Sequence, residues 1–150
     1  MQAGEQHAVK VLNGLIETTL ETAEGYKEAA EHTHNPEYKR MFAERAQRRR
    51  ELMRRLQEEV RSFGAKPDDH QSMMGKLHTK FSGLKETMAG GSDKAVIDEV
   101  ERGEDVIKAK FEKAAQDADL PEPARQLVAT AYTEVKADHD TISALKHRMH

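Results

Sequence analysis

The chain has 150 residues, of which 34% are charged and 37% hydrophobic, and its formal net charge is −3. This length suits one domain over residues 1–150 with a sizeable core, and the composition is typical of helices that each carry one apolar stripe. The chain has no cysteine, which excludes disulfides, thiolate metal sites and thiol catalysis. Because nothing in the net charge attracts nucleic acid, we expect no nucleic-acid partner.

No apolar run approaches the roughly 18–20 residues that cross a membrane. Residues 1–7 lack the basic and apolar regions of a signal peptide. We therefore expect a cytoplasmic protein with no membrane partner. The sequence leaves open a homodimer and an unidentified protein partner.

The first helical pattern covers about residues 6–32. Apolar and small residues share one face at helical spacing, and they are Leu12, Leu15, Ile16, Thr19, Ala23, Tyr26 and Ala30. Four carboxylates fall on the opposite side, which predicts a solvent-facing surface rather than a row of metal ligands. They are Glu17, Glu21, Glu24 and Glu28.

The second pattern begins at Asn35 and Pro36, because asparagine is a favoured N-cap and proline fits the first helical position. It ends just before Gly64. Arg45 and Arg49 interrupt its apolar stripe, which comprises Tyr38, Met41, Phe42, Leu52, Leu56, Val60 and Phe63. The other arginines of this helix interleave with glutamates at ion-pair spacings, which indicates surface ion pairs rather than nucleic-acid binding.

Residues 65–91 are too many for a tight turn and carry apolar residues at helical spacing, namely Met74, Leu77, Phe81, Leu84 and Met88. This spacing predicts a short amphipathic crossover helix that ends at Gly90 and Gly91 and covers the flank of the long helices. The alternative is an interaction module that docks on a partner protein through the methionine-rich helix of residues 73–88.

The third long pattern starts at Ser92 or Asp93, either of which can cap a helix, and ends near residue 118. Glu104 lies inside its apolar stripe of Ile97, Val100, Ile107, Phe111 and Ala115. The fourth pattern follows the break at Pro121 and runs to about residue 146. Asp138 lies inside the stripe of this last helix.

Four long patterns, two tight hairpins and one long crossover predict an all-α fold. The expected architecture is a ferritin-like antiparallel four-helix bundle with a short helix in the crossover between helices two and three. In this connectivity the third long helix begins at the same end of the bundle as the turn at residues 34–36. Heights along the bundle can therefore be counted from that end at about 1.5 Å per residue.

This count predicts a polar layer at one height, in a core where a carboxylate is costly unless it is paired or bound to a metal. One interpretation is a buried salt-bridge network of Tyr26, Arg45, Arg49, Glu104 and Asp138. The other is an iron or manganese site whose ligands are Glu101, Glu104, Asp138 and His139. Glu134 would lie at the margin of either.

Ferritin-type metal sites use a Glu-x-x-His pair from each of two helices, and the core-facing stripes of this chain carry no such pair. Arg45 and Arg49 stand where ligands would be needed, which favours the salt-bridge network and no bound cofactor. The serines and threonines lack a placed His–Asp partner, so nucleophilic catalysis has no support and we do not expect an enzyme.

Several short segments stand out together: residues 12–19, Glu24-Gly25-Tyr26, Gly75-Lys76-Leu77-His78, Glu101-Arg102-Gly103-Glu104-Asp105 and His139-Asp140. Their combination resembles a bacterial family of short ferritin-like four-helix-bundle proteins of unknown function. The resemblance covers nearly the whole chain and implies the ferritin-like fold. It implies no particular activity, although such relatives are often supposed to have a stress-associated role.

We therefore expect a non-enzymatic bundle with a structural salt-bridge layer and a stress-related role. A divergent iron- or manganese-binding ferritin-like oxidase is the first alternative. An interaction module is the second. Compared with ferritins and rubrerythrins the chain departs at the Glu-x-x-His positions, so the resemblance implies neither iron storage nor peroxide reduction.

Overall fold

The computed structural model describes residues 2–149, and the side chains within this range apart from those of residues 78–85 and 87. It contains five α-helices, which are α1 (Ala3–His32), α2 (Pro36–Ser62), α3 (His70–Ala89), α4 (Asp93–Ala115) and α5 (Glu122–Met149). Residues 2–149 contain no β-strand. The prediction of an all-α fold is therefore confirmed. No helix in the described range is long and apolar enough to span a membrane.

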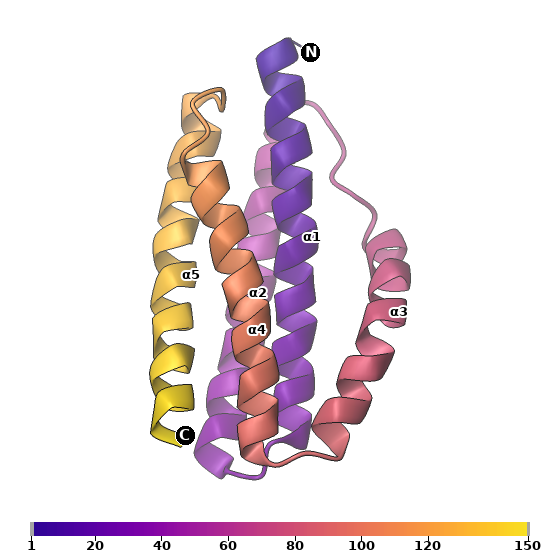
Figure 1. Ribbon diagram of the computed structural model, residues 1–150. Coiled ribbons are helices and arrows are strands. Elements are labelled where there is room, and N and C mark those ends of the chain that lie inside the picture. Colours follow the sequence, from indigo (N-terminus) through magenta and orange to yellow (C-terminus); the bar gives the residue numbers. More distant parts are fainter. Residues whose placement is uncertain (1, 150) are drawn as a thin grey trace.

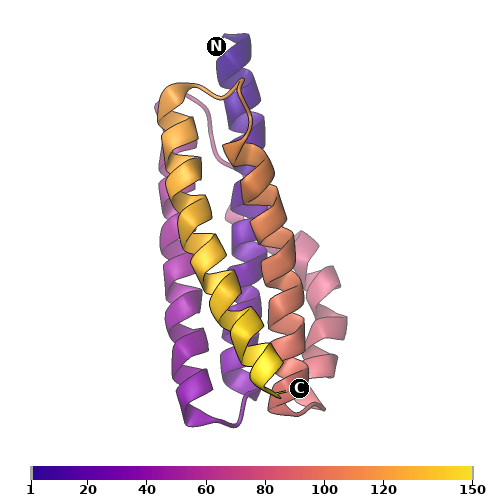
Figure 2. The same ribbon diagram turned by 60° about the vertical axis from the view of Figure 1, so that its left-hand side comes forward.

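Four long helices, α1, α2, α4 and α5, run side by side, and α3 lies outside them next to α1 (Figures 1 and 2). The most extensive packing is within the α1–α2 hairpin and the α4–α5 hairpin, and α1 also packs on α4. The segment before α3 and α3 itself carry the chain back along the molecule. As a result α4 begins beside the turn between α1 and α2 (Figure 1).

A carboxylate ties these two neighbouring ends together. Asp93 Oδ1 accepts a 2.7 Å hydrogen bond from the backbone N–H of His34, and Asp93 Oδ2 accepts one of 3.0 Å from that of Asn35. Ser92 caps α4 instead, because its side chain accepts from Ala95 N at 3.3 Å. Of the two caps that the sequence left open, the structure thus uses Ser92.

The turns at both ends of α2 follow from local chemistry. The Asn35 side chain accepts from the backbone N–H of Glu37 at 2.9 Å, and Pro36 occupies the first helical position, as predicted. After the last turn Gly64 adopts φ +78°, a left-handed conformation that side chains disfavour. The helix therefore ends where the glycine allows the chain to turn away.

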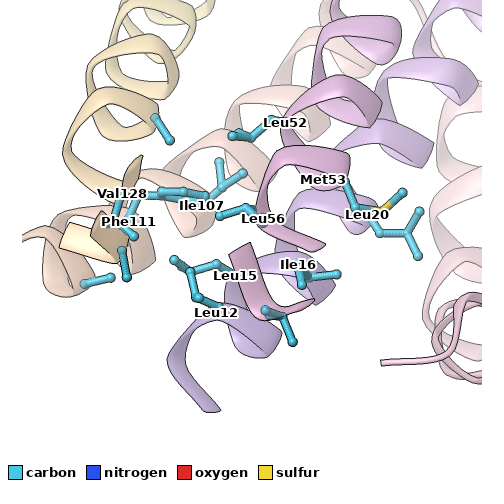
Figure 3. Close-up of a cluster of buried hydrophobic side chains, with 14 of the residues drawn as sticks. Leu12, Leu15, Ile16, Leu20, Leu52, Met53, Leu56, Ile107, Phe111 and Val128 are labelled. Atoms are coloured by element: carbon cyan, nitrogen blue, oxygen red, sulfur yellow. The ribbon is translucent and has the colours of Figure 1, made fainter. Parts of the chain in front are cut away.

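Two buried apolar clusters fill the space between the long helices. The larger contains buried apolar side chains from residues 8–20 of α1, 52–60 of α2, 107–114 of α4 and 124–135 of α5, together with Met73 and Leu77 of α3 (Figure 3). The smaller contains buried apolar side chains from residues 26–29 of α1, 42–46 of α2, 96–100 of α4 and 142–145 of α5. On every long helix several residues separate the two clusters. Arg49, Glu104 and Asp138 lie in these gaps, whereas Arg45 lies at the edge of the smaller cluster.

The crossover helix differs from its prediction. It spans 20 residues, longer than the expected short helix. Met73 is buried and Met74 only partly, so the buried face is rotated by about one residue. Leu77 and Met88 are buried as the spacing predicted. Phe81 and Leu84 lie outside the described side chains.

The predicted solvent-facing side of α1 is partly covered. Glu28 is only 6% exposed, so for this residue the prediction was wrong. Glu17, Glu21 and Glu24 are half-buried. The pattern of α1 alone does not reveal that α3 packs on this helix, nor that Arg50 of α2 reaches to 3.7 Å from the Glu24 carboxylate.

Candidate functional site

The charged layer between the two apolar clusters is the candidate site. Each of the four long helices contributes at least one polar side chain that is buried. They are Thr22 and Tyr26 of α1, Arg45 and Arg49 of α2, Glu104 of α4 and Asp138 of α5. Helical rise explains the placement, since each group lies in the gap between the two apolar segments of its own helix or within two residues of it.

Arg49 is at the centre of the layer. Its Nη2 lies 2.9 Å from Glu104 Oε1 and 3.2 Å from Asp138 Oδ2. Its Nη1 donates a 3.0 Å hydrogen bond to the hydroxyl of Thr22. One guanidinium therefore joins side chains from the three other long helices.

Tyr26 supplies the second donor to Glu104. Its hydroxyl donates a hydrogen bond of 2.5 Å to Glu104 Oε1. The guanidinium carbons of Arg49 and Arg45 lie 5.4 and 6.0 Å from the centre of its ring, within the range of cation–π attraction. Phe42 packs against the same ring at 5.9 Å between centres, which joins the layer to the smaller apolar cluster.

Asp138 is the acceptor on α5. Arg45 Nε lies 3.3 Å from Asp138 Oδ1, and Arg48 also pairs with Oδ1 from the solvent side. Arg48 was not among the residues predicted for the layer, because it lies outside the apolar stripe of α2. Its distance of three residues from Arg45 was the available signal, since this spacing places both on one side of the helix.

The layer shifts the pKa values of two of its members. Burial, and next the Glu104 carboxylate, raise the pKa of Tyr26 well above its usual range. Burial alone would lower the pKa of Arg49, but the interactions with Glu104, Tyr26 and Asp138 together outweigh burial, and the net pKa is raised. Tyr26 therefore stays a neutral donor and Arg49 stays charged, and the two buried arginines balance the two buried carboxylates.

Each of the four residues of the predicted metal site already has a charged or titratable partner. Glu104 and Asp138 pair within the layer, while Glu101 lies 2.8 Å from Lys146 Nζ. His139 lies between two other carboxylates, with Nε2 at 2.6 Å from Asp105 and Nδ1 at 3.2 Å from Asp140. Glu134, predicted at the margin, pairs with Arg55 at 2.9 Å.

Elsewhere in the described part of the chain, two groups of acidic and histidine side chains bring potential ligand atoms within 4.8 Å of one another. They are His7 with Asp117 and Asp119, and Glu28 with Glu31 and His32. Glu31 also begins a Glu-x-x-His spacing with His34, but α1 ends at His32, so this pair does not lie on a core-facing helix.

Comparison with known proteins gives a family and no activity. No curated protein matches the chain. A family model described as a domain of unknown function, DUF2383, matches residues 7–117. The match includes Tyr26, Arg45, Arg49 and Glu104, whereas Asp138 on α5 lies beyond it. Since the match covers well over half of the chain, this protein belongs to the DUF2383 family.

Proposed function

We propose that the protein is a non-enzymatic, ferritin-like four-helix bundle, one domain over residues 1–150, whose buried charged layer is structural. The observation that carries the proposal is the position of Arg49, which lies between Glu104 and Asp138 and joins α2 to α4 and α5. The order of the four long helices and the return of the chain along the outside support the ferritin-like assignment.

The layer would set the register of the helices. A buried ion pair adds little net stability compared with apolar packing, but breaking one is expensive, so it penalises wrong alignments. Sliding one helix by a turn would move its polar group about 5.4 Å into an apolar cluster. Such a layer specifies one alignment of four helices whose apolar stripes are otherwise similar.

The alternative of an iron or manganese oxidase has less support. A metal at the layer needs carboxylate oxygens that face a cation, but those of Glu104 and Asp138 face guanidinium groups. Positive charge already occupies the space between them and repels a cation. The donors present therefore do not suit the metal centre of a ferritin-type protein.

Docking through residues 73–88 is also less favoured. Met73, Leu77 and Met88 are each at most 2% exposed, so a partner could reach them only if α3 left the core. The arginines of α2 likewise have partners, such as Glu51 for Arg54 and Glu134 for Arg55, which does not favour nucleic-acid binding. The stress-related role rests on the family resemblance alone.

Metal binding by purified, tag-free protein tests the proposal. Glu101 and His139 belong to the rival metal site but not to the layer, so Glu101→Gln and His139→Gln can be made without breaking the network. We expect equilibrium dialysis with Mn(II), and with Fe(II) under anaerobic conditions, to give the same bound metal for both variants and the natural sequence. Stoichiometric metal that is lost in either variant would overturn the proposal.

A further inference from the structure

A separate group of side chains lies at the end of the molecule opposite the α1–α2 turn. His7 projects from the first turns of α1, and Asp117 and Asp119 lie in the connection between α4 and α5, which is at the same end (Figure 1). His7 Nε2 lies 2.7 Å from Asp117 Oδ2, and one ligand atom from each of the three residues lies within 4.8 Å of the others.

These separations suit a small divalent cation. A zinc ion with bonds of about 2.1 Å in tetrahedral geometry holds neighbouring ligand atoms about 3.4 Å apart. The distance of 2.7 Å and the limit of 4.8 Å bracket this value, so small side-chain movements would complete the site. One imidazole with two carboxylates and no thiolate is a donor set for zinc and its first-row neighbours.

The group is more than a set of surface acids, because an imidazole and a carboxylate far apart in sequence point at each other. The other carboxylate oxygen of Asp117 accepts a 2.9 Å hydrogen bond from the backbone N–H of Asp119, which fixes the orientation of the carboxylate. No hydrogen bond or ion pair of the described residues engages the Asp119 carboxylate, which leaves it available to an ion.

We propose that His7, Asp117 and Asp119 bind one divalent transition-metal ion of the zinc type, which joins the start of α1 to the connection between α4 and α5. Water would complete the coordination on the exposed side. The proposal does not rest on the proposed function, because the larger apolar cluster separates this group from the charged layer.

Calorimetric titration of the metal-free, tag-free full chain with ZnCl₂ tests the site. The variants are His7→Gln and Asp119→Asn, which remove one ligand each. The matched control is His32→Gln in the other histidine–carboxylate group, where Glu28 is already buried. Far-UV circular dichroism establishes that each variant keeps its helical content.

We expect one Zn²⁺ per chain, an affinity at least tenfold weaker in His7→Gln and Asp119→Asn, and an unchanged affinity in His32→Gln. Zn²⁺ should also raise the melting temperature of the natural sequence and not that of His7→Gln, because binding stabilises the folded state. Unchanged Zn²⁺ affinity in His7→Gln, or a loss of affinity confined to His32→Gln, would overturn the proposal. Neither result would bear on the Mn(II) and Fe(II) comparison with Glu101→Gln and His139→Gln.

Discussion

Arg49 Nη2 lies 2.9 Å from Glu104 Oε1, and the two side chains are only 3% and 1% exposed. Arg49 is on α2 and Glu104 is on α4. The α2–α4 pair is not among the extensively packed helix pairs. The ion pair therefore crosses the interior rather than following a seam between neighbouring helices. Its loss would leave an unpaired charge in the buried interior.

The first prediction concerns Glu104→Ala. Removing this carboxylate leaves Arg49 buried with one acceptor fewer and deprives the Tyr26 hydroxyl of its acceptor. We expect the free energy of unfolding, measured in urea, to fall by about 3–5 kcal/mol. The control is Glu101→Ala, which breaks a partly exposed pair with Lys146 and should cost about 1 kcal/mol or less. Equal losses in the two variants would contradict a special role for the buried acid.

The second prediction concerns alkaline pH. Because the pKa of Tyr26 is raised in the folded state, the folded protein keeps a proton that the unfolded chain releases above about pH 10. Stability should therefore be unaffected by this group below that pH and decline above it, by up to about 1.4 kcal/mol per pH unit. Urea unfolding between pH 9 and 11.5 should show that Tyr26→Phe removes this part of the slope and Tyr38→Phe does not.

The third prediction concerns Asp93, which accepts from two backbone N–H groups of the α1–α2 turn. Asp93→Ala leaves both donors without this acceptor and should lower the free energy of unfolding by about 1–3 kcal/mol. Asp93→Asn keeps one acceptor oxygen and should cost less. If thermal melts rank the two variants in the opposite order, Asp93 does not act through these hydrogen bonds.

The fourth prediction uses two glycines with opposite backbone requirements. Gly103 lies within α4, and a Cβ added there meets no atom within 4 Å. Gly103→Ala should raise stability by about 0.5–1 kcal/mol, because alanine is the better helix former. Gly64 has φ +78°, so Gly64→Ala should lower stability by about 1–2 kcal/mol. A loss of stability in Gly103→Ala would contradict this expectation.

The height of the charged groups could be predicted from the sequence because an α-helix rises by a fixed amount per residue. Counting from the end where the α1–α2 turn meets α4 predicted one height for Arg49, Glu104 and Asp138, and the structure has direct contacts among them. The count depends only on the connectivity, the helix boundaries and the rise per residue. It therefore needed no knowledge of side-chain conformations.

The partners at the edge of the layer could not be predicted in this way. Glu101 and His139 have the right height, but their side chains reach Lys146 and Asp105 between α4 and α5. Arg48 lies on the outer side of α2, yet its side chain is long enough to return to Asp138. Rotation about the helix axis and the reach of long side chains decide such pairs, and helical periodicity constrains both only loosely.

A double-mutant cycle on Arg49 and Glu104 tests the central claim most directly, since it isolates the interaction between the two residues from the cost of each replacement. The measurements are the free energies of unfolding in urea of Arg49→Ala, Glu104→Ala, the double variant and the natural sequence. If the layer is a structural salt-bridge network, the double variant should be less destabilised than the sum of the single variants by at least about 1.5 kcal/mol. Additivity within about 0.5 kcal/mol would show that the two charges do not stabilise each other and would contradict the account.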